Sequence, residues 1–116
     1  MGELKERLES GIAHKNAGEY DLAEAEFKAV LEADPYCAEA HRQLGLVYGF
    51  TGEFDEAIGE LRKATELAPD SAPIMVDFGL TCAMVGLDDE AKAAFEAALR
   101  IDPTNSTARK NLAYYA

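Results

Sequence analysis

Apolar residues recur every three to four positions along most of the chain, and short polar turns containing glycine or proline separate the apolar stretches. The pattern is clearest over residues 38–50 and 54–67, which each carry one apolar face and are separated by Thr51, Gly52 and Glu53. An apolar stripe with this spacing predicts an amphipathic helix. The same spacing predicts further helices over residues 4–17, 20–33, 72–85, 88–101 and 106–115.

The helical pattern is repeated with a fixed period of 34 positions, a length typical of helix–turn–helix arrays. Four columns keep this period: Pro35, Pro69 and Pro103; Gly18, Gly52 and Gly86; Gly11, Gly45 and Gly79; Ala23, Ala57 and Ala91. Because the turns are short, neighbouring helices are expected to run antiparallel. The sequence therefore predicts one all-α domain over residues 1–116, with repeats at 4–37, 38–71 and 72–105, a capping helix at 106–116, and one continuous core.

The residues in these columns resemble the tetratricopeptide repeat family. The matching positions are Leu44, Gly45, Tyr48, Gly52, Phe54, Ala57, Leu61, Ala64 and Pro69 in the middle unit, and Phe78, Gly79, Gly86, Ala91, Phe95, Ala98 and Pro103 in the third. The resemblance implies an α-α superhelix, a right-handed solenoid of antiparallel helix pairs, that binds other proteins and has no catalytic role. Departures from the pattern are His41, Met75 and Asp88 in aromatic columns, and Arg7, Ser10 and His14 in core columns of the first unit.

A second stripe of side chains, roughly 150° from the core stripe, runs along the first helix of each unit. By the resemblance, these helices line a concave surface, where the stripes would merge into one groove. The predicted groove residues are Leu8, Ile12, Lys15, Asn16, Arg42, Leu46, Phe50, Val76, Leu80, Met84, Lys110 and Tyr114. Two interpretations are open: packing between adjacent first helices, or an exposed site for a peptide or helix of a partner protein. The basic residues among them favour a partner segment with some negative charge.

Some members of the family hold the C-terminal carboxylate of heat-shock chaperones in a clamp of lysine, asparagine and arginine side chains. The resemblance places Leu8, Ile12, Gln43, Pro73 and Asp77 at the clamp positions of this chain. The cations are missing, and Asp77 would repel a carboxylate. We therefore expect that such a carboxylate is not the ligand.

The net charge of −11, from 22 acidic and 11 basic residues, excludes other kinds of partner. Nucleic acids and anionic membranes attract basic surfaces, so neither is expected to bind. No apolar run approaches the ~18 residues that span a bilayer, and the charged segment 1–13 does not resemble a signal peptide. Cys37 and Cys82 are interpreted as free thiols, which favours a cytoplasmic location.

The sequence contains no motif for catalysis. His14 and His41 lack recurring partners, and the glycines occupy turn and packing positions rather than a phosphate-binding loop. We expect no enzyme activity, no cofactor and no metal site. The apolar segment 112–116 supports an alternative function, in which the terminal helix mediates self-association or the binding of an apolar client, as in secretion chaperones.

Overall fold

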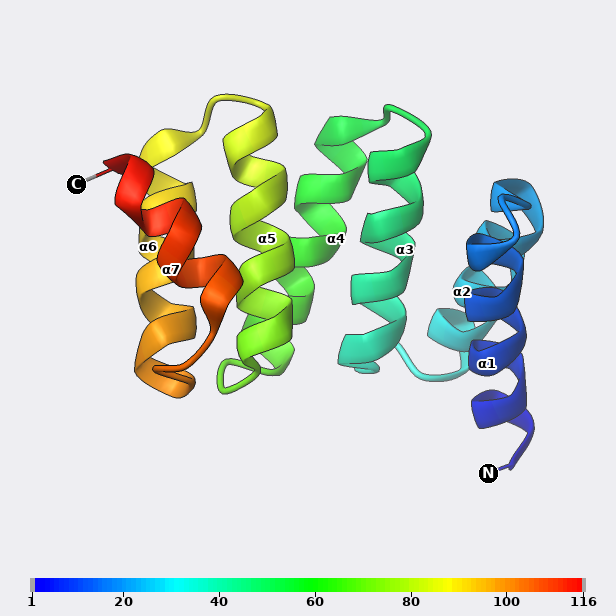
Figure 1. Cartoon of the computed structure of the whole chain (residues 1–116). Helices are drawn as coiled ribbons and strands as arrows, with labels where there is room; N and C mark the ends of the chain where they lie inside the picture. The colour runs from blue at the N-terminus through cyan, green and yellow to red at the C-terminus, as the bar shows by residue number, and fades with distance from the viewer. Residues whose placement is uncertain (1, 116) are drawn as a thin grey trace.

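The computed structural model describes residues 2–115, and these form helices joined by short turns, with no strand among them (Figure 1). The helices are α1 Gly2–Asn16, α2 Tyr20–Ala33, α3 Ala38–Phe50, α4 Phe54–Leu67, α5 Ala72–Met84, α6 Asp88–Ile101, α7 Ser106–Leu112 and the 3-10 turn η1 Ala113–Tyr115. The predicted helices are confirmed, with bounds within two residues of those predicted, except that the last one gives way to η1 after Leu112. Consecutive helices pack in antiparallel pairs, and α7 packs on α6.

The three turns inside the helix pairs are built around one glycine each. Gly18, Gly52 and Gly86 have φ angles of +78°, +82° and +83°, in the left-handed region that disfavours side chains. In each turn the following amide donates back to a carbonyl five residues earlier, as in Glu53 N–H to Tyr48 O at 2.9 Å. This helix-ending motif explains why glycine recurs in that column.

A second glycine column lets the two helices of each pair approach closely. A Cβ atom on Gly11, Gly45 or Gly79 would lie 2.5, 2.7 or 2.8 Å from the nearest side-chain atom of the facing helix. The facing residues are Phe27, Leu61 and Phe95, and all three are fully buried. The column therefore pairs one glycine with one large side chain in every repeat, which allows close packing of the two helices.

The buried side chains form two clusters rather than the one continuous core that the repeat pattern predicted. An N-terminal cluster contains Ala23, Phe27, Leu44, Val47, Tyr48 and Ala57. A C-terminal cluster contains Ile58, Leu61, Val76, Phe78, Cys82, Ala91, Ala94, Phe95, Ala98 and Ala108. The two clusters meet in α4, where Ala57 belongs to the first and Ile58 and Leu61 to the second.

Two departures from the repeat pattern are accommodated by polar contacts. His41 is 7% exposed, and its two ring nitrogens lie 2.7 Å from Glu60 Oε1 and 2.8 Å from Pro35 O. In the first unit, Arg7 donates to Glu26 at 3.0 Å on the surface, so this side of α1 faces water.

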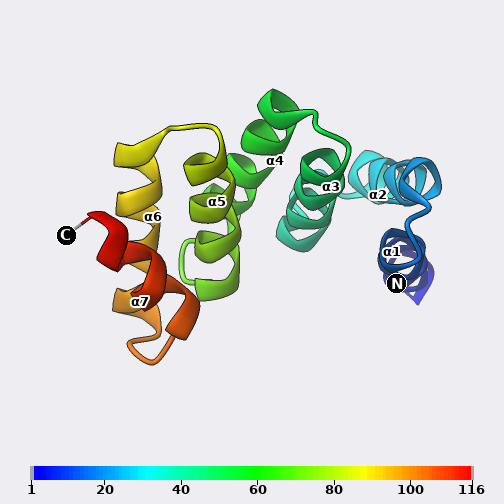
Figure 2. The same cartoon turned by 45° about the horizontal axis from the view of Figure 1, so that its top comes forward.

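The helix pairs are arranged as an arc that measures 43 × 27 × 21 Å. Figure 2 shows that α1, α3 and α5 lie on the inner side of the arc and α2, α4 and α6 on its outer side. The inner helices also touch each other directly, α1 with α3 and α3 with α5. The first helix of each repeat therefore presents a side chain surface to the concave face, as the resemblance implied.

Candidate functional site

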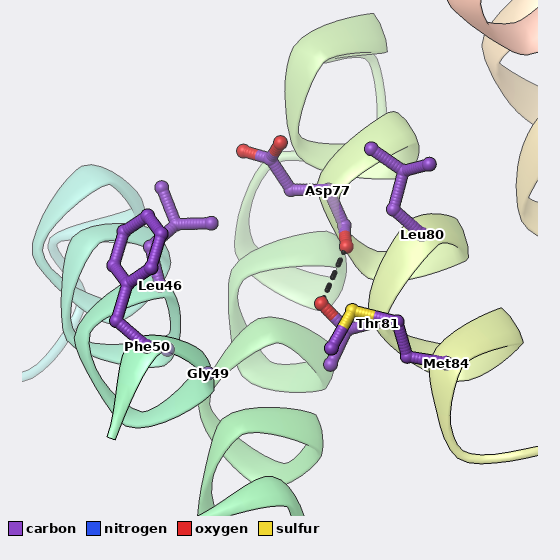
Figure 3. Close-up of a pocket in the computed structure, with 8 residues that line it drawn as sticks. Leu46, Gly49, Phe50, Asp77, Leu80, Thr81 and Met84 are labelled. Carbon is purple, nitrogen blue, oxygen red and sulfur yellow. Dashed lines mark hydrogen bonds between the residues drawn. The ribbon is translucent and has the colours of Figure 1, made fainter. Parts of the chain in front are cut away.

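A cavity of about 200 Å³ opens between the C-terminal halves of the inner helices α3 and α5. Its lining residues are Gly45, Leu46, Gly49, Phe50, Asp77, Leu80, Thr81 and Met84. Figure 3 shows Leu46 and Phe50 on the α3 side of the gap and Asp77, Leu80, Thr81 and Met84 on the α5 side. The Thr81 hydroxyl donates to the backbone carbonyl of Asp77 at 2.9 Å, so its polar atom is already satisfied and the walls are mainly apolar.

Two large apolar side chains of this cavity remain accessible to water. Phe50 is 62% exposed and Met84 is 63% exposed. The Phe50 ring is held in place by Tyr20, because the two rings stack with centroids 5.5 Å apart and planes 18° from parallel. An aromatic side chain that is both exposed and fixed offers contact area at a low entropic cost for binding.

A chain of polar contacts crosses the concave face beside the cavity, and we call it the concave ladder. Lys15 donates to Gln43 at 2.6 Å, and Gln43 donates to Glu39 at 2.7 Å. Arg42 donates to Asp77 at 2.6 Å and lies 3.5 Å from Glu39. The concave ladder thus connects α1, α3 and α5 through two cations and two carboxylates, whose charges sum to zero.

Burial and mutual pairing shift the titration of the two cations in the concave ladder. Burial lowers the pKa of Lys15, and the positive charge of Arg42 lowers it further. Burial also acts to lower the pKa of Arg42, but the hydrogen bond and charge of Asp77 and the charge of Glu39 outweigh it, so the Arg42 pKa is raised. Both cations therefore have partners within the chain, which weakens the basis for predicting a negatively charged ligand.

The structure brings together part of the predicted groove. Leu46, Phe50, Leu80 and Met84 line the cavity, and Lys15 and Arg42 lie beside it in the concave ladder. Val76 is only 8% exposed and belongs to the C-terminal cluster together with Ala108 of α7. The expectation that Val76 opens into the groove is therefore corrected, because its side chain is buried in the C-terminal cluster.

The remaining predicted residues lie elsewhere. Leu8 and Ile12 are half-buried against the N-terminal cluster, and Asn16 is exposed at the end of α1. Lys110 lines a separate hollow on α7, and Tyr114 is 90% exposed on η1. These five residues do not contribute to the cavity between α3 and α5.

The predicted groove residues did not include Gly45, Gly49, Asp77 or Thr81, which also line the cavity. A signal for two of them was present, because residues 77, 81 and 84 are spaced by four and three positions on α5 and share one helical face. Because Asp77 and Thr81 are polar, they do not belong to the apolar stripe from which the groove was predicted.

The described residues hold no group of three or more histidine, cysteine, aspartate or glutamate side chains placed to bind a metal ion. Cys37 and Cys82 are both free thiols, as predicted. Across residues 2–115, no helix combines the length and apolar character that crossing a bilayer requires.

Comparisons with known proteins agree with the repeat geometry. One tetratricopeptide repeat family model matches residues 8–72 and a second matches residues 72–105. A comparison with curated protein sequences found no match.

Several solved structures have the same fold. The first tetratricopeptide domain of Spaghetti (RPAP3), bound to the HSP90 peptide SRMEEVD, has a TM-score of 0.90 at 22% identity, covering 96% of this chain and 88% of that one. The tetratricopeptide domain of Sgt2 from Aspergillus fumigatus has a TM-score of 0.91 at 18% identity, covering 98% and 77%. A Thermobaculum terrenum O-GlcNAc transferase mutant has a TM-score of 0.87 at 26% identity, covering 94% of this chain but 21% of that one. With family models matched from residue 8 to residue 105, the chain belongs to the tetratricopeptide repeat family.

Proposed function

We propose that this protein is a non-catalytic interaction module that binds an apolar side chain of a partner protein in the cavity between α3 and α5. The observation that carries this proposal is the pair of accessible apolar side chains, Phe50 at 62% and Met84 at 63% exposure, at one concave cavity. Exposed apolar clusters of this kind mark binding surfaces. Covering Phe50 alone contributes roughly 1–2 kcal/mol from the apolar area removed from water.

The size of the cavity specifies what it accepts. Its volume of about 200 Å³ exceeds the roughly 150 Å³ of an apolar cavity that holds benzene. One aromatic or branched aliphatic side chain therefore fits between Leu46 and Leu80, and Met84 can adapt its conformation to the shape of that side chain. The occupant is a peptide or helical segment of another protein that presents such a side chain.

Membership of the tetratricopeptide repeat family supports this role, because related domains have been solved with peptides of other proteins, including RPAP3 domains with HSP90 and HSP70 peptides. The absence of nucleic-acid and membrane partners stays a prediction from the net charge of −11. The cytoplasmic location likewise stays a prediction, and the two free thiols support it.

The test is a titration with a short peptide that carries one central phenylalanine, monitored through backbone amide signals by NMR. We expect shifts at Gly49, Phe50, Leu80 and Met84. Phe50→Ala should weaken binding at least about fivefold, the equivalent of 1 kcal/mol. Shifts located only outside α3 and α5 would show that the cavity is not the site.

The matched control is Tyr36→Ala, which removes an aromatic side chain that is 78% exposed in the turn between α2 and α3. It should leave peptide binding unchanged. Equal loss of affinity in Tyr36→Ala and Phe50→Ala would mean that exposed aromatic surface, rather than the cavity, drives the interaction.

Self-association through the C-terminal segment is the second candidate function, and one observation favours it. Tyr114 is 90% exposed, whereas Leu112 and Tyr115 pack against the C-terminal cluster. Light scattering over a concentration series tests this candidate. A dimer that disappears in Tyr114→Lys would support it, and a monomer at every concentration would contradict it.

A further inference from the structure

We infer that the site selects a segment in which the apolar side chain is accompanied by a lysine or arginine, and that it rejects segments flanked by acidic residues. The inference rests on the proposed function, because the cavity between α3 and α5 remains the place where the apolar side chain binds. It adds the charge of the partner, which the cavity itself does not specify.

The cations on the concave face already have partners within the chain. The cations of the concave ladder, Lys15 and Arg42, already contact Gln43, Glu39 and Asp77 at 2.6 to 3.5 Å. A carboxylate of a ligand would have to displace these internal partners and would then face Glu39 and Asp77. An acidic segment therefore gains no cation from this floor without breaking contacts that the folded chain already makes.

A hollow lies where the turn between α1 and α2 and the start of α2 meet the end of α3. It has a volume of about 300 Å³ and is lined by Gly18, Glu19, Tyr20, Asp21, Leu22 and Thr51. The stacked rings of Tyr20, in the wall of the hollow, and Phe50, in the wall of the cavity, stand between the two. A ligand segment that lies across this aromatic pair would reach both.

The hollow combines acidic side chains with an aromatic ring. Its two charged lining residues, Glu19 and Asp21, are both acidic and exposed, and Tyr20 supplies an aromatic face beside them. Glu53 adds a third carboxylate beside the hollow, because it accepts from the Thr51 hydroxyl at 2.7 Å, and His14 Nδ1 lies 2.9 Å from Glu19 Oε1. The N-terminal dipole of α2 offsets part of the negative potential, but two carboxylates next to an aromatic ring still favour an ammonium or guanidinium group.

Long-range electrostatic attraction also favours a basic segment. The chain carries a net charge of −11, so a basic segment is drawn toward it and an acidic one is repelled. Taken together, an apolar cavity, an adjoining acidic hollow and a self-neutralised floor fit a basic segment with a bulky apolar side chain.

The experiment compares two labelled peptides that share a central phenylalanine and differ only in their flanks, which are lysines in one and glutamates in the other. Fluorescence anisotropy gives the affinity of each at low and high salt, and SRMEEVD serves as a third probe. We expect the lysine peptide to bind at least about tenfold tighter than either acidic peptide, with a preference that shrinks as salt screens the charges.

Two charge reversals locate the effect. Asp21→Lys should reduce the affinity for the lysine peptide by about fivefold, the upper end of what one exposed charge pair contributes. Asp55→Lys makes the same change of charge at the same repeat position in α4, outside the hollow, and should leave the affinity within about twofold.

The possible failures are distinguishable. If the glutamate peptide binds as tightly as the lysine peptide and Phe50→Ala still weakens both, the inference is overturned and the proposed function stands. If Asp21→Lys and Asp55→Lys have equal effects, the hollow is not the site of selection and the inference is overturned. If neither peptide binds, both the inference and the proposed function fail.

Discussion

Replacing Gly45 by alanine tests whether the close approach of α3 and α4 holds the middle repeat together. The new Cβ atom would lie 2.7 Å from Leu61 Cγ and 3.2 Å from the backbone carbonyl of Ala57. Leu61 is fully buried, so its side chain has little room to move. The Ala57 carbonyl is part of the α4 backbone and cannot move without shifting that helix. The substitution therefore forces α3 and α4 apart.

The expected size follows from two opposing contributions. Alanine instead of glycine in a helix interior adds about 1 kcal/mol of stability. Overpacking costs about 1–3 kcal/mol, and the rigid backbone neighbour puts Gly45→Ala in the upper half of that range. The net loss is then about 1–2 kcal/mol, which lowers the melting temperature by roughly 4–8 °C for a chain of this size.

The assay is thermal and urea unfolding of Gly45→Ala beside Gly59→Ala. Gly59 also lies inside a helix, but a Cβ atom there would meet nothing within 4 Å, so this control should gain about 0.5–1 kcal/mol. If Gly45→Ala were as stable as Gly59→Ala, the close approach of the helices would not be the reason for glycine at this position.

Three further predictions concern stability. Burial raises the pKa of the Cys82 thiol from 9.0 to about 11, so the unfolded chain releases this proton first and stability that is present below pH 9 is lost toward pH 11. Urea unfolding between pH 9 and pH 11 should show this loss, and Cys82→Ala should make the free energy of unfolding fall less steeply with pH. An equally steep fall in both proteins would show that Cys82 is not the cause. Arg42→Ala leaves the buried side of the Asp77 carboxylate without its partner and should cost about 1–3 kcal/mol, against about 1 kcal/mol or less for surface-exposed Arg62→Ala. His41→Ala removes the ring that contacts the Glu60 carboxylate and the Pro35 carbonyl and should cost about 2–3 kcal/mol in urea unfolding, so a loss below 1 kcal/mol would show that water replaces the ring.

The fold could be predicted from the sequence because each repeat column has a local physical cause. Gly52 is required by a positive φ angle and Gly45 by contact with Leu61, and both requirements recur in every unit. Helical periodicity placed Phe50 and Met84 on one face of their helices, and both line the cavity. These features depend on one helix or one helix pair, which a sequence pattern describes well.

The features that the sequence could not show depend on how neighbouring repeats are oriented. Arg42 contacts Asp77 across two helices, and nothing in the local pattern of either residue indicates that contact. Val76 is buried in the C-terminal cluster, which also includes Ala108 of α7, although its position on the helical wheel matches that of Arg42 in the repeat before. Assigning charge to the groove required side-chain pairings that only the assembled arc provides.

The division of the interior into two clusters that meet in α4 has a consequence for how the chain opens. Ala57 and Ile58 are neighbours in α4 but belong to different clusters, so the N-terminal and C-terminal halves share one helix rather than one core. In repeat proteins each unit contacts only its neighbours, and opening can begin locally. We expect amide hydrogen exchange to be slowest in α4 and to become faster toward both ends, because the terminal helices open before the central one.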